Sequence, residues 1–217
     1  MDGNRRWAKE RGLSPLQGHR AGFDNLKKIG DACLDRGIEV LSVYAFSIEN
    51  WKRAEEEVGY LMDLLEQGLR EELAHFVEKQ VRVRILGRRE GLRPSVVAAC
   101  NAIERETKDF TRGTLCICLN YGGRTEIVDA CRRLCAEGVT PDKIDEAAIQ
   151  SRLYWPDMPE LDLMIRTSGE ERISGFLTWQ SAYSEFYWSP KHWPDFDEAE
   201  LDTALETFAA RERRYGK

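Results

Sequence analysis

Short apolar runs alternate along the chain with longer segments in which apolar residues recur at helical spacing. Runs of the first kind are typical of strands buried on both faces, and segments of the second kind are typical of amphipathic helices. The predicted strands cover residues 40–46, 81–86, 114–119, 162–165 and 185–188. The predicted helices cover residues 22–36, 56–79, 94–109, 125–136, 146–153 and 198–213. This alternation predicts an α/β fold with a central, mostly parallel sheet flanked by helices.

Length and charge limit what kind of protein this is. With 217 residues, 42% of them hydrophobic, and no repeat, low-complexity tract or linker, the sequence predicts a single domain over residues 1–217. A net charge of −6 argues against nucleic acid or an anionic membrane as the main partner. No apolar run reaches the ~20 residues that span a bilayer, and no secretory leader is present. We therefore expect a cytoplasmic protein that binds no nucleic acid.

The six cysteines fall mostly within apolar, periodic segments and lack the paired spacing of a zinc site. They are interpreted as reduced core thiols. They are Cys33, Cys100, Cys116, Cys118, Cys131 and Cys135. The chain also contains no phosphate-binding loop of the nucleotide-hydrolase type, no dinucleotide fingerprint, no serine-hydrolase elbow and no Asp-Asp-x-x-Asp pair. Candidate catalytic or binding sites therefore have to be sought in other clusters of polar residues.

The first cluster stands at the start of a predicted helix and consists of Asp2, Gly3, Asn4, Arg5, Arg6 and Trp7. Gly3 and Asn4 tolerate positive φ, so backbone N–H groups at the helix start can converge on a phosphate beside Arg5 and Arg6. Asp2 would repel that phosphate, which points to magnesium between the two anions. The alternative is a surface turn capped by an aspartate.

Among the histidines, His19 directly follows Gly18 and is close enough to Asp2 in the chain to join its site. His75 and His192 are interpreted as structural or exposed.

Two further clusters follow predicted strands, where ligands bind in open α/β sheets. The second cluster of the chain contains Ser47, Ile48, Glu49, Asn50, Trp51, Lys52 and Arg53, and the third cluster covers residues 166–174. Asn50 can donate and accept hydrogen bonds, while arginines and hydroxyls around a glycine turn can close on a diphosphate. The alternatives are a polar loop with a buried Trp51, and glutamates that neutralise the arginines as surface ion pairs.

A fourth cluster places Glu185 among aromatic residues at 183–188. A carboxylate in such surroundings needs a metal ion or an arginine as its partner.

Six segments together resemble the cis-prenyltransferases, of the undecaprenyl diphosphate synthase type. They are residues 1–8, 18–22, 44–51, 120–124, 165–174 and 193–196, and the match runs in order over essentially the whole chain. The family has a stretch before the aspartate that includes a strand, so this resemblance implies a first strand missing upstream of Met1. It also implies a hydrophobic tunnel for the growing chain. Candidate tunnel walls are Ala45, Phe46, residues 58–76 and residues 115–119, which ordinary core packing explains equally well.

The resemblance implies a magnesium-dependent homodimer that condenses isopentenyl diphosphate onto an allylic diphosphate such as farnesyl diphosphate. The product would be a long Z-polyprenyl diphosphate such as undecaprenyl diphosphate, and its apolar chain would allow peripheral membrane contact. Asp2 would be the essential acid and a magnesium ligand, Asn50 would assist proton removal, and Glu185 would bind metal, from the partner subunit's side of the dimer. The implied allylic-substrate residues are Gly3, Asn4, Arg5, Arg6, Trp7, His19, Ser47, Ile48, Glu49, Trp51 and Arg53. The implied isopentenyl diphosphate residues are Arg166, Arg172, Ile173 and Ser174.

Four positions depart from the family pattern. Pro15 stands where many members have an arginine, Ile48 replaces a small hydroxyl residue, Gly175 replaces an asparagine, and Glu171 lies where some relatives have a metal-binding histidine. Two other functions stay open: a non-catalytic family member that only binds a lipid or protein, and a phosphatase.

Overall fold

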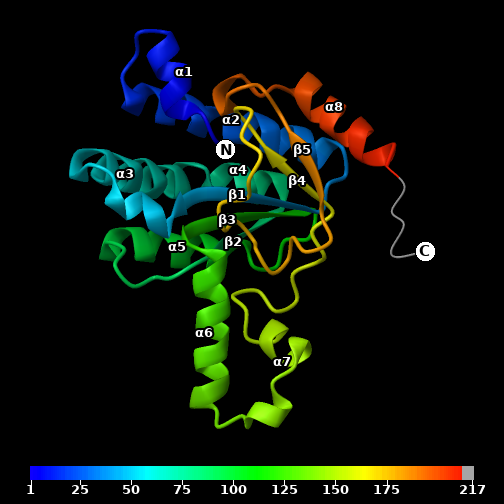
Figure 1. The fold of residues 1–217 in the computed structure, drawn as a ribbon. Helices are drawn as coiled ribbons and strands as arrows, with labels where there is room; N and C mark the ends of the chain where they lie inside the picture. The colour runs from blue at the N-terminus through cyan, green and yellow to red at the C-terminus, as the bar shows by residue number, and fades with distance from the viewer. Residues whose placement is uncertain (212–217) are drawn as a thin grey trace. The chain divides into compact units, whose positions relative to one another are not determined.

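The structure, a computed structural model, describes residues 1–211, which divide into two compact units (Figure 1). The first unit contains Met1–Arg36, Glu160–Ile173 and the described residues from Gln180 onward. The second contains Gly37–Pro159 and Ser174–Trp179.

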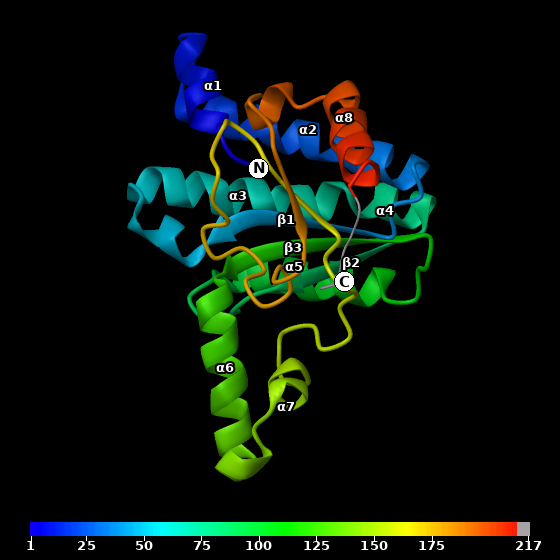
Figure 2. The ribbon, with the colours of Figure 1, turned by 45° about the vertical axis from the view of Figure 1, so that its right-hand side comes forward.

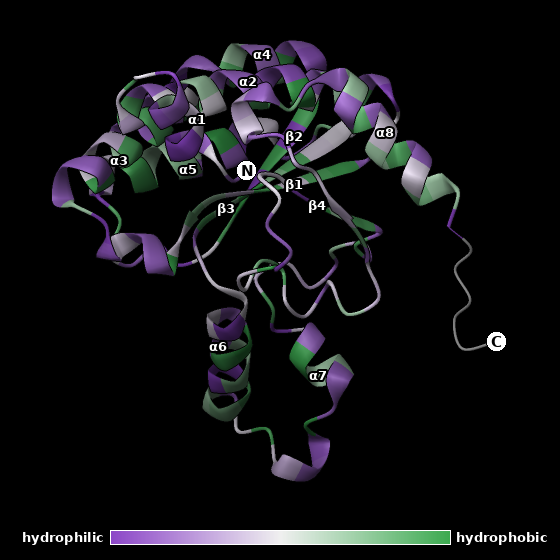
Figure 3. Cartoon of the chain, turned by 45° about the horizontal axis from the view of Figure 1, so that its top comes forward, coloured by the Kyte–Doolittle hydropathy of each residue, from purple (hydrophilic) through white to green (hydrophobic). Residues whose placement is uncertain are grey.

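A three-stranded parallel sheet forms the centre of the second unit, with strand order β1-β3-β2. The strands are β1 (Val40–Ser47), β2 (Val81–Leu86) and β3 (Gly113–Tyr121). Ile117 of β3 pairs with Val43 on one side and with Ile85 on the other. In the central strand β3 every residue except Thr114 is buried, and burial of side chains on both faces accounts for its continuous apolar run. Figure 3 shows these strands mostly in the hydrophobic colour.

Helices connect and cover these strands. They are η1 (Ile48–Lys52), α3 (Glu55–Glu71), α4 (Leu73–Lys79), α5 (Pro94–Thr107), α6 (Gly123–Ala136), η2 (Pro141–Lys143) and α7 (Glu146–Gln150). Helix α5 packs on β2, and α3 packs on α5, while α6 extends away from the sheet with α7 beside it (Figure 1). The single helix predicted over residues 56–79 is interrupted at Glu72, and nothing in the sequence marks this break.

The first unit combines helices with a two-stranded parallel sheet. Its elements are α1 (Asn4–Glu10), α2 (Pro15–Asp35), β4 (Leu163–Arg166), β5 (Glu185–Trp188), η3 (Trp193–Asp195) and α8 (Glu198–Ala209). Leu163 pairs with Glu185, and Arg166 pairs with Trp188. Helix α8 lies beside α2 (Figure 2). The last helix was predicted to reach residue 213, and residues 212 and 213 lie outside the described part of the chain.

Helix α2 begins seven residues before the predicted start, because its N-terminus carries a complete capping box. The Ser14 hydroxyl accepts from the Gln17 N–H, the Gln17 side chain accepts from the Ser14 N–H, and Pro15 occupies the first helical position. Gly18, in the first turns of α2, has a packing role. A Cβ at Gly18 would lie 2.1 Å from the Asn4 carbonyl oxygen, so glycine lets α1 approach α2 closely.

The predicted α/β class is confirmed, and all five predicted strands are present. In the described chain they pair as two parallel sheets, of three and two strands. Four cysteines are buried as predicted, whereas Cys131 is half-buried and Cys135 is exposed on α6. Within residues 1–211, no helix combines the length and the apolar composition needed to cross a membrane.

Candidate active site

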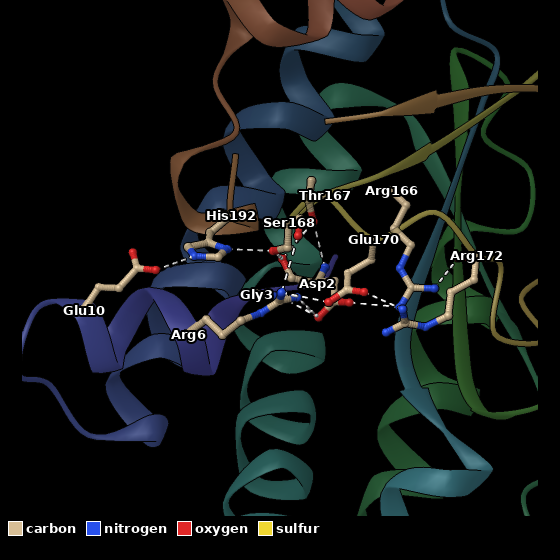
Figure 4. A network of polar contacts seen from close by, with 10 residues as sticks. All are labelled: Asp2, Gly3, Arg6, Glu10, Arg166, Thr167, Ser168, Glu170, Arg172 and His192. Atoms are coloured by element: carbon tan, nitrogen blue, oxygen red, sulfur yellow. Dashed lines mark hydrogen bonds and ion pairs between the residues drawn. The ribbon is translucent and has the colours of Figure 1, made fainter. Parts of the chain in front are cut away.

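The Asp2 carboxylate lies between two arginines of the first unit (Figure 4). Its Oδ2 is 3.0 Å from Nη2 of Arg166, at the end of β4, and its Oδ1 is 3.5 Å from Nη2 of Arg6 in α1. Oδ1 also accepts a 2.7 Å hydrogen bond from the Gly3 N–H. Partial burial raises the pKa of Asp2, but Arg166, the Gly3 N–H and Arg6 together hold that pKa below 3.8. The carboxylate is therefore ionised at neutral pH.

Backbone contacts fix the position of Asp2. Its N–H donates to Thr167 Oγ1 at 2.9 Å, and that hydroxyl donates back to the Asp2 carbonyl at 2.8 Å. The Trp193 N–H donates to the same carbonyl at 2.9 Å. The next residue, Gly3, has a left-handed φ of 101°, and a Cβ there would lie 2.0 Å from Ser168 Oγ. Only glycine fits at this position.

Glu170 joins a third guanidinium group, that of Arg172, to this cluster. Its Oε1 accepts from Arg6 Nη1 at 2.8 Å, and its Oε2 pairs with Arg172, whose carbonyl accepts from Arg166. The hydrogen bond from Arg172 is the main reason that the pKa of Glu170 lies below 4.5. The ion-pair alternative for residues 166–174 thus applies to Glu170, which partly neutralises the arginines that gather at this turn. Three guanidiniums against two carboxylates leave a net positive charge that suits an anion.

Trp7 and the segment 193–196 hold α1 in place. Trp7 Nε1 donates to Asp195 Oδ1 at 2.7 Å, and Arg11 Nη2 donates to Asp195 Oδ2 at 2.9 Å. Trp193 Nε1 donates to the Gly22 carbonyl at 2.6 Å, and the buried Asn25 amide donates to the carbonyls of 193 and 196. This segment therefore anchors the start of the chain.

In the second unit, Asn50 caps the turn that follows β1. Its Oδ1 accepts a 2.9 Å hydrogen bond from the Ser47 N–H, which occupies one of the two acceptor sites of the amide oxygen, and its Nδ2 hydrogens are donors that can act on a ligand. Arg53 forms a 3.0 Å ion pair with Glu57 on α3.

Trp51, also in the second unit, is held by Asn120. Trp51 Nε1 donates to Asn120 Oδ1 at 2.8 Å, and the Trp51 ring meets Phe46 edge-on. Asn120 itself adopts a left-handed φ of 49° and donates to the carbonyls of Arg88 and Glu90. Trp51 is 38% exposed. The alternative interpretation of this segment, a polar loop with a buried Trp51, is therefore wrong about the burial of the tryptophan.

The remaining predicted residues lie at varied depths. Asn4 is the first residue of α1, not a positive-φ residue, and faces Gly18 and Gly22 of α2, while Arg5 is exposed. His19 is buried in α2. Of the others, Ile48 and Ile173 are half-buried, and Glu49 and Ser174 are exposed.

Glu185 lies at the opposite end of the β4–β5 pair from Asp2. It pairs with Leu163, three residues before Arg166, which corresponds to about 10 Å along a strand. Its carboxylate forms a 2.6 Å ion pair with Arg211, so its partner is an arginine outside the predicted clusters. The described chain does not bring Asp2 and Glu185 together to share one ion.

Sequence reasoning missed two residues of the Asp2 cluster and the roles of two others. Thr167 and Ser168 were expected to face a diphosphate, but both hydroxyls bond the Asp2 backbone. His192 and Glu10, which were not assigned to the site, extend the network from Ser168. The one available signal was the position of His192 directly before the anchoring segment 193–196.

Comparison with known proteins identifies the family. A family model that describes undecaprenyl diphosphate synthases matches residues 1–216. An isoprenyl transferase of Thermotoga maritima is 48% identical over 218 residues, which cover 100% of this chain and 94% of the relative. The chain belongs to the undecaprenyl diphosphate synthase family. The predicted resemblance to cis-prenyltransferases is confirmed.

Two further proteins are also similar to this chain. A trans,polycis-polyprenyl diphosphate synthase of Thermobifida fusca, specific for (2Z,6E)-farnesyl diphosphate, is 45% identical and matches 100% of this chain and 78% of its own length. The crystal structure of lavandulyl diphosphate synthase from Lavandula x intermedia, in complex with dimethylallyl diphosphate, superimposes with a TM-score of 0.96 at 34% identity. That match covers 100% of this chain and 95% of the lavender enzyme.

Three departures from the usual undecaprenyl diphosphate synthase pattern have local structural reasons. Pro15 begins α2, where its fixed φ suits the first helical position. Ile48 packs against Gly122, at which a Cβ would come within 3.2 Å of the Ile48 side chain. Gly175 has a left-handed φ of 76°, and its carbonyl accepts the Gly123 N–H.

Magnesium fits the Asp2 side of the cluster by ligand chemistry. A carboxylate that stays ionised is a hard oxygen ligand, and Mg²⁺ commonly binds one or two carboxylates together with substrate phosphates and water. Within residues 1–211 there is no group of three or more His, Cys, Asp or Glu side chains arranged for a metal. An ion at Asp2 would therefore need oxygens from a bound diphosphate.

Proposed function

We propose that this member of the family catalyses cis-prenyl chain elongation, condensing isopentenyl diphosphate with an allylic diphosphate to give a long Z-polyprenyl diphosphate. The observation that carries the proposal is the Asp2, Arg6, Arg166, Glu170 and Arg172 cluster, with its ionised carboxylate and surplus of guanidiniums. Such a group suits a reaction whose leaving group is a diphosphate.

The reaction breaks the allylic carbon–oxygen bond, and diphosphate leaves with the electron pair. The isopentenyl double bond supplies the electrons of the new carbon–carbon bond, and one proton then leaves the former isopentenyl unit. In our proposal Arg166, Arg172, Ile173 and Ser174 bind isopentenyl diphosphate. The allylic substrate is bound by Gly3, Asn4, Arg5, Arg6, Trp7, His19, Ser47, Ile48, Glu49, Trp51 and Arg53.

Asn50 would act as a hydrogen-bond donor. Because its oxygen already accepts from Ser47, and because an amide is a very weak base, Asn50 would assist proton removal by orienting a diphosphate oxygen that takes the proton.

Magnesium would be held by Asp2 and substrate oxygens, and when bound it would neutralise charge on the departing diphosphate. Glu185 would contribute to metal binding only from a partner subunit in a homodimer, since it lies at the far end of β5 from Asp2. The free thiols of the described chain suit a reducing compartment, so we propose that the enzyme works in the cytoplasm.

The growing chain would be accommodated by apolar residues of α3. Val58, Leu61, Met62, Leu64 and Leu69 are buried there, although core packing explains their burial equally well. Each added isoprene unit carries five carbons, and at ~0.8 kcal/mol per buried CH₂ one cycle gains up to roughly 4 kcal/mol. Enlarging or shrinking these side chains should change the product distribution.

The test is incubation of the purified protein with labelled isopentenyl diphosphate, Mg²⁺ and either farnesyl or dimethylallyl diphosphate. Label recovered in a lipid extract supports prenyl transfer, and its chromatographic size gives the chain length. Release of phosphate alone would mean a phosphatase, and binding without either product would mean a non-catalytic family member. Comparison of the two primers shows which allylic chain length is preferred.

A further inference from the structure

The imidazole of His192 bridges two parts of the first unit (Figure 4). Its Nδ1 lies 2.7 Å from Ser168 Oγ, and its Nε2 lies 3.0 Å from Glu10 Oε1, at the end of α1. The His192 side chain is 16% exposed and the Glu10 side chain 59%. A largely enclosed imidazole thus connects a glutamate in contact with solvent to the turn that follows β4.

The hydrogen bonds determine where the imidazole proton lies. A carboxylate only accepts, so the proton shared with Glu10 belongs to Nε2 of His192. In the neutral imidazole Nδ1 then accepts, and Ser168 is the donor. Ser168 Oγ also lies 3.0 Å from the Asp2 carbonyl, but that carbonyl already accepts from Thr167 Oγ1 and from the Trp193 N–H, so we assign the single Ser168 proton to the nearer His192 Nδ1.

Ser168 adopts a backbone conformation that needs such support. Its φ of 76° lies in the left-handed region, which residues other than glycine rarely occupy. Its N–H donates to the Lys191 carbonyl at 2.7 Å, and its hydroxyl fills the space that a Cβ on Gly3 would need. Its carbonyl lies 3.4 Å from Arg6 Nη1. Any rotation of Ser168 would therefore displace Gly3 and Arg6, and Gly3 carries the N–H that holds Asp2.

We propose that His192, oriented by Glu10, is a positioning residue for diphosphate binding. It holds Ser168 in its left-handed conformation and thereby keeps Asp2 and Arg6 in place to receive a magnesium-bound diphosphate. His192 has no contact with Asp2 itself among the hydrogen bonds of the described chain, so it acts through Ser168. This inference rests on the proposed function, because a diphosphate is the ligand that the cluster is proposed to bind.

The test uses two substitutions of His192, each of which keeps a polar group at the position of only one of the two ring nitrogens. In His192→Asn the amide occupies the place of Nδ1 and can still bond Ser168, whereas in His192→Gln the amide reaches toward Glu10 and leaves Ser168 without this partner. The probe is inorganic diphosphate with Mg²⁺, and its dissociation constant is measured by calorimetry. Asn and Gln substitutions of His75, in α4 of the second unit, are the matched controls.

We expect H192N to bind diphosphate as the wild type does, and H192Q to bind it about 10- to 100-fold more weakly, with melting temperatures within about 4 °C of the wild type. In a Ser168→Ala background the difference between H192N and H192Q should disappear. If H192Q does not fold, Ser168→Ala alone gives the answer, since removal of the hydroxyl that His192 holds should weaken diphosphate binding to the same extent.

Equal diphosphate affinity in H192N and H192Q, or a difference that persists without the Ser168 hydroxyl, would overturn the inference. Prenyl transfer by the wild-type protein is assayed separately. A wild type that binds diphosphate and shows the H192N/H192Q difference, but transfers no prenyl group, refutes the proposed function and leaves the inference standing. A wild type that binds no diphosphate refutes both.

Discussion

The carboxylate of Asp2 and the guanidinium of Arg166 lie 3.0 Å apart although 164 positions separate them in the chain. Arg166 is only 16% exposed in its side chain, so the pair is shielded from solvent on the arginine side. Substitution of Asp2 would remove the carboxylate that pairs with a partly buried guanidinium, and with it the ionised oxygen ligand that we propose for magnesium.

Asp2→Asn should therefore reduce the rate of isopentenyl diphosphate incorporation by about 100- to 1000-fold, the range typical for loss of one group that stabilises a developing anion. The matched control is Asp24→Asn, on α2, whose carboxylate pairs with Arg20 on the surface. A rate for D2N within about tenfold of the wild type, or about 1.4 kcal/mol in barrier height, would contradict the assignment of Asp2.

Glu170→Gln should lower KM for isopentenyl diphosphate by about two- to fivefold, because the glutamate competes with this substrate for Arg172 and an exposed ion pair is weak. Titration of the substrate at low and high salt measures this, and the gain should shrink as salt rises. Glu171→Gln, next to it and exposed, is the control. An increase in KM would mean that Glu170 orients the arginines instead of competing with substrate.

Gly18→Ala should destabilise the protein by about 1–3 kcal/mol, as overpacking does, because the new Cβ meets the Asn4 carbonyl oxygen and the Ala8 side chain. Gly30→Ala, in the same helix, meets no atom within 4 Å and should stabilise the protein by roughly 0.5–1 kcal/mol. Urea unfolding of both variants tests this. Similar changes in both would show that the α1–α2 contact can relax around a methyl group.

Asp129→Asn should lower the free energy of unfolding at pH 7 by about 1–2 kcal/mol, after allowance for solvent screening. Arg88, above all, and a hydrogen bond from Tyr154 lower the pKa of Asp129 to about 2. Since this folded pKa lies below the ordinary 3.8, the stabilisation is complete above pH 3.8 and is lost as the pH falls toward 2.

The difference between wild type and D129N should therefore shrink on acidification from pH 5 to pH 2.5, measured by urea unfolding at each pH. Asp142→Asn, at an exposed position in η2, should leave the stability unchanged throughout. A difference for D129N that is independent of pH would mean that packing, and not charge, explains the effect.

The strands were predictable from the sequence because burial on both faces leaves an apolar run such as that of β3. Their division into two sheets was not predictable, because an apolar run indicates burial but not the partner strand. The start of α2 was missed although Ser14, Pro15 and Gln17 form a capping box, and the close contact of Gly18 and Gly22 with Asn4 exists only in three dimensions. The same reason applies to the candidate site. Motifs indicated Asp2 and Arg166, but the link from Glu10 through His192 to Ser168 has no local signature.

The division of the chain between the two units also constrains the order of folding during synthesis. Apart from Ser174–Trp179, the second unit is contiguous and can begin to form its sheet as soon as Tyr121 has left the ribosome. The first unit joins Met1–Arg36 to strands that are translated last, so the opening segment must wait for most of translation before its partners exist. Nascent chains truncated before residue 160 should accordingly lack any protease-resistant fragment from the first 36 residues.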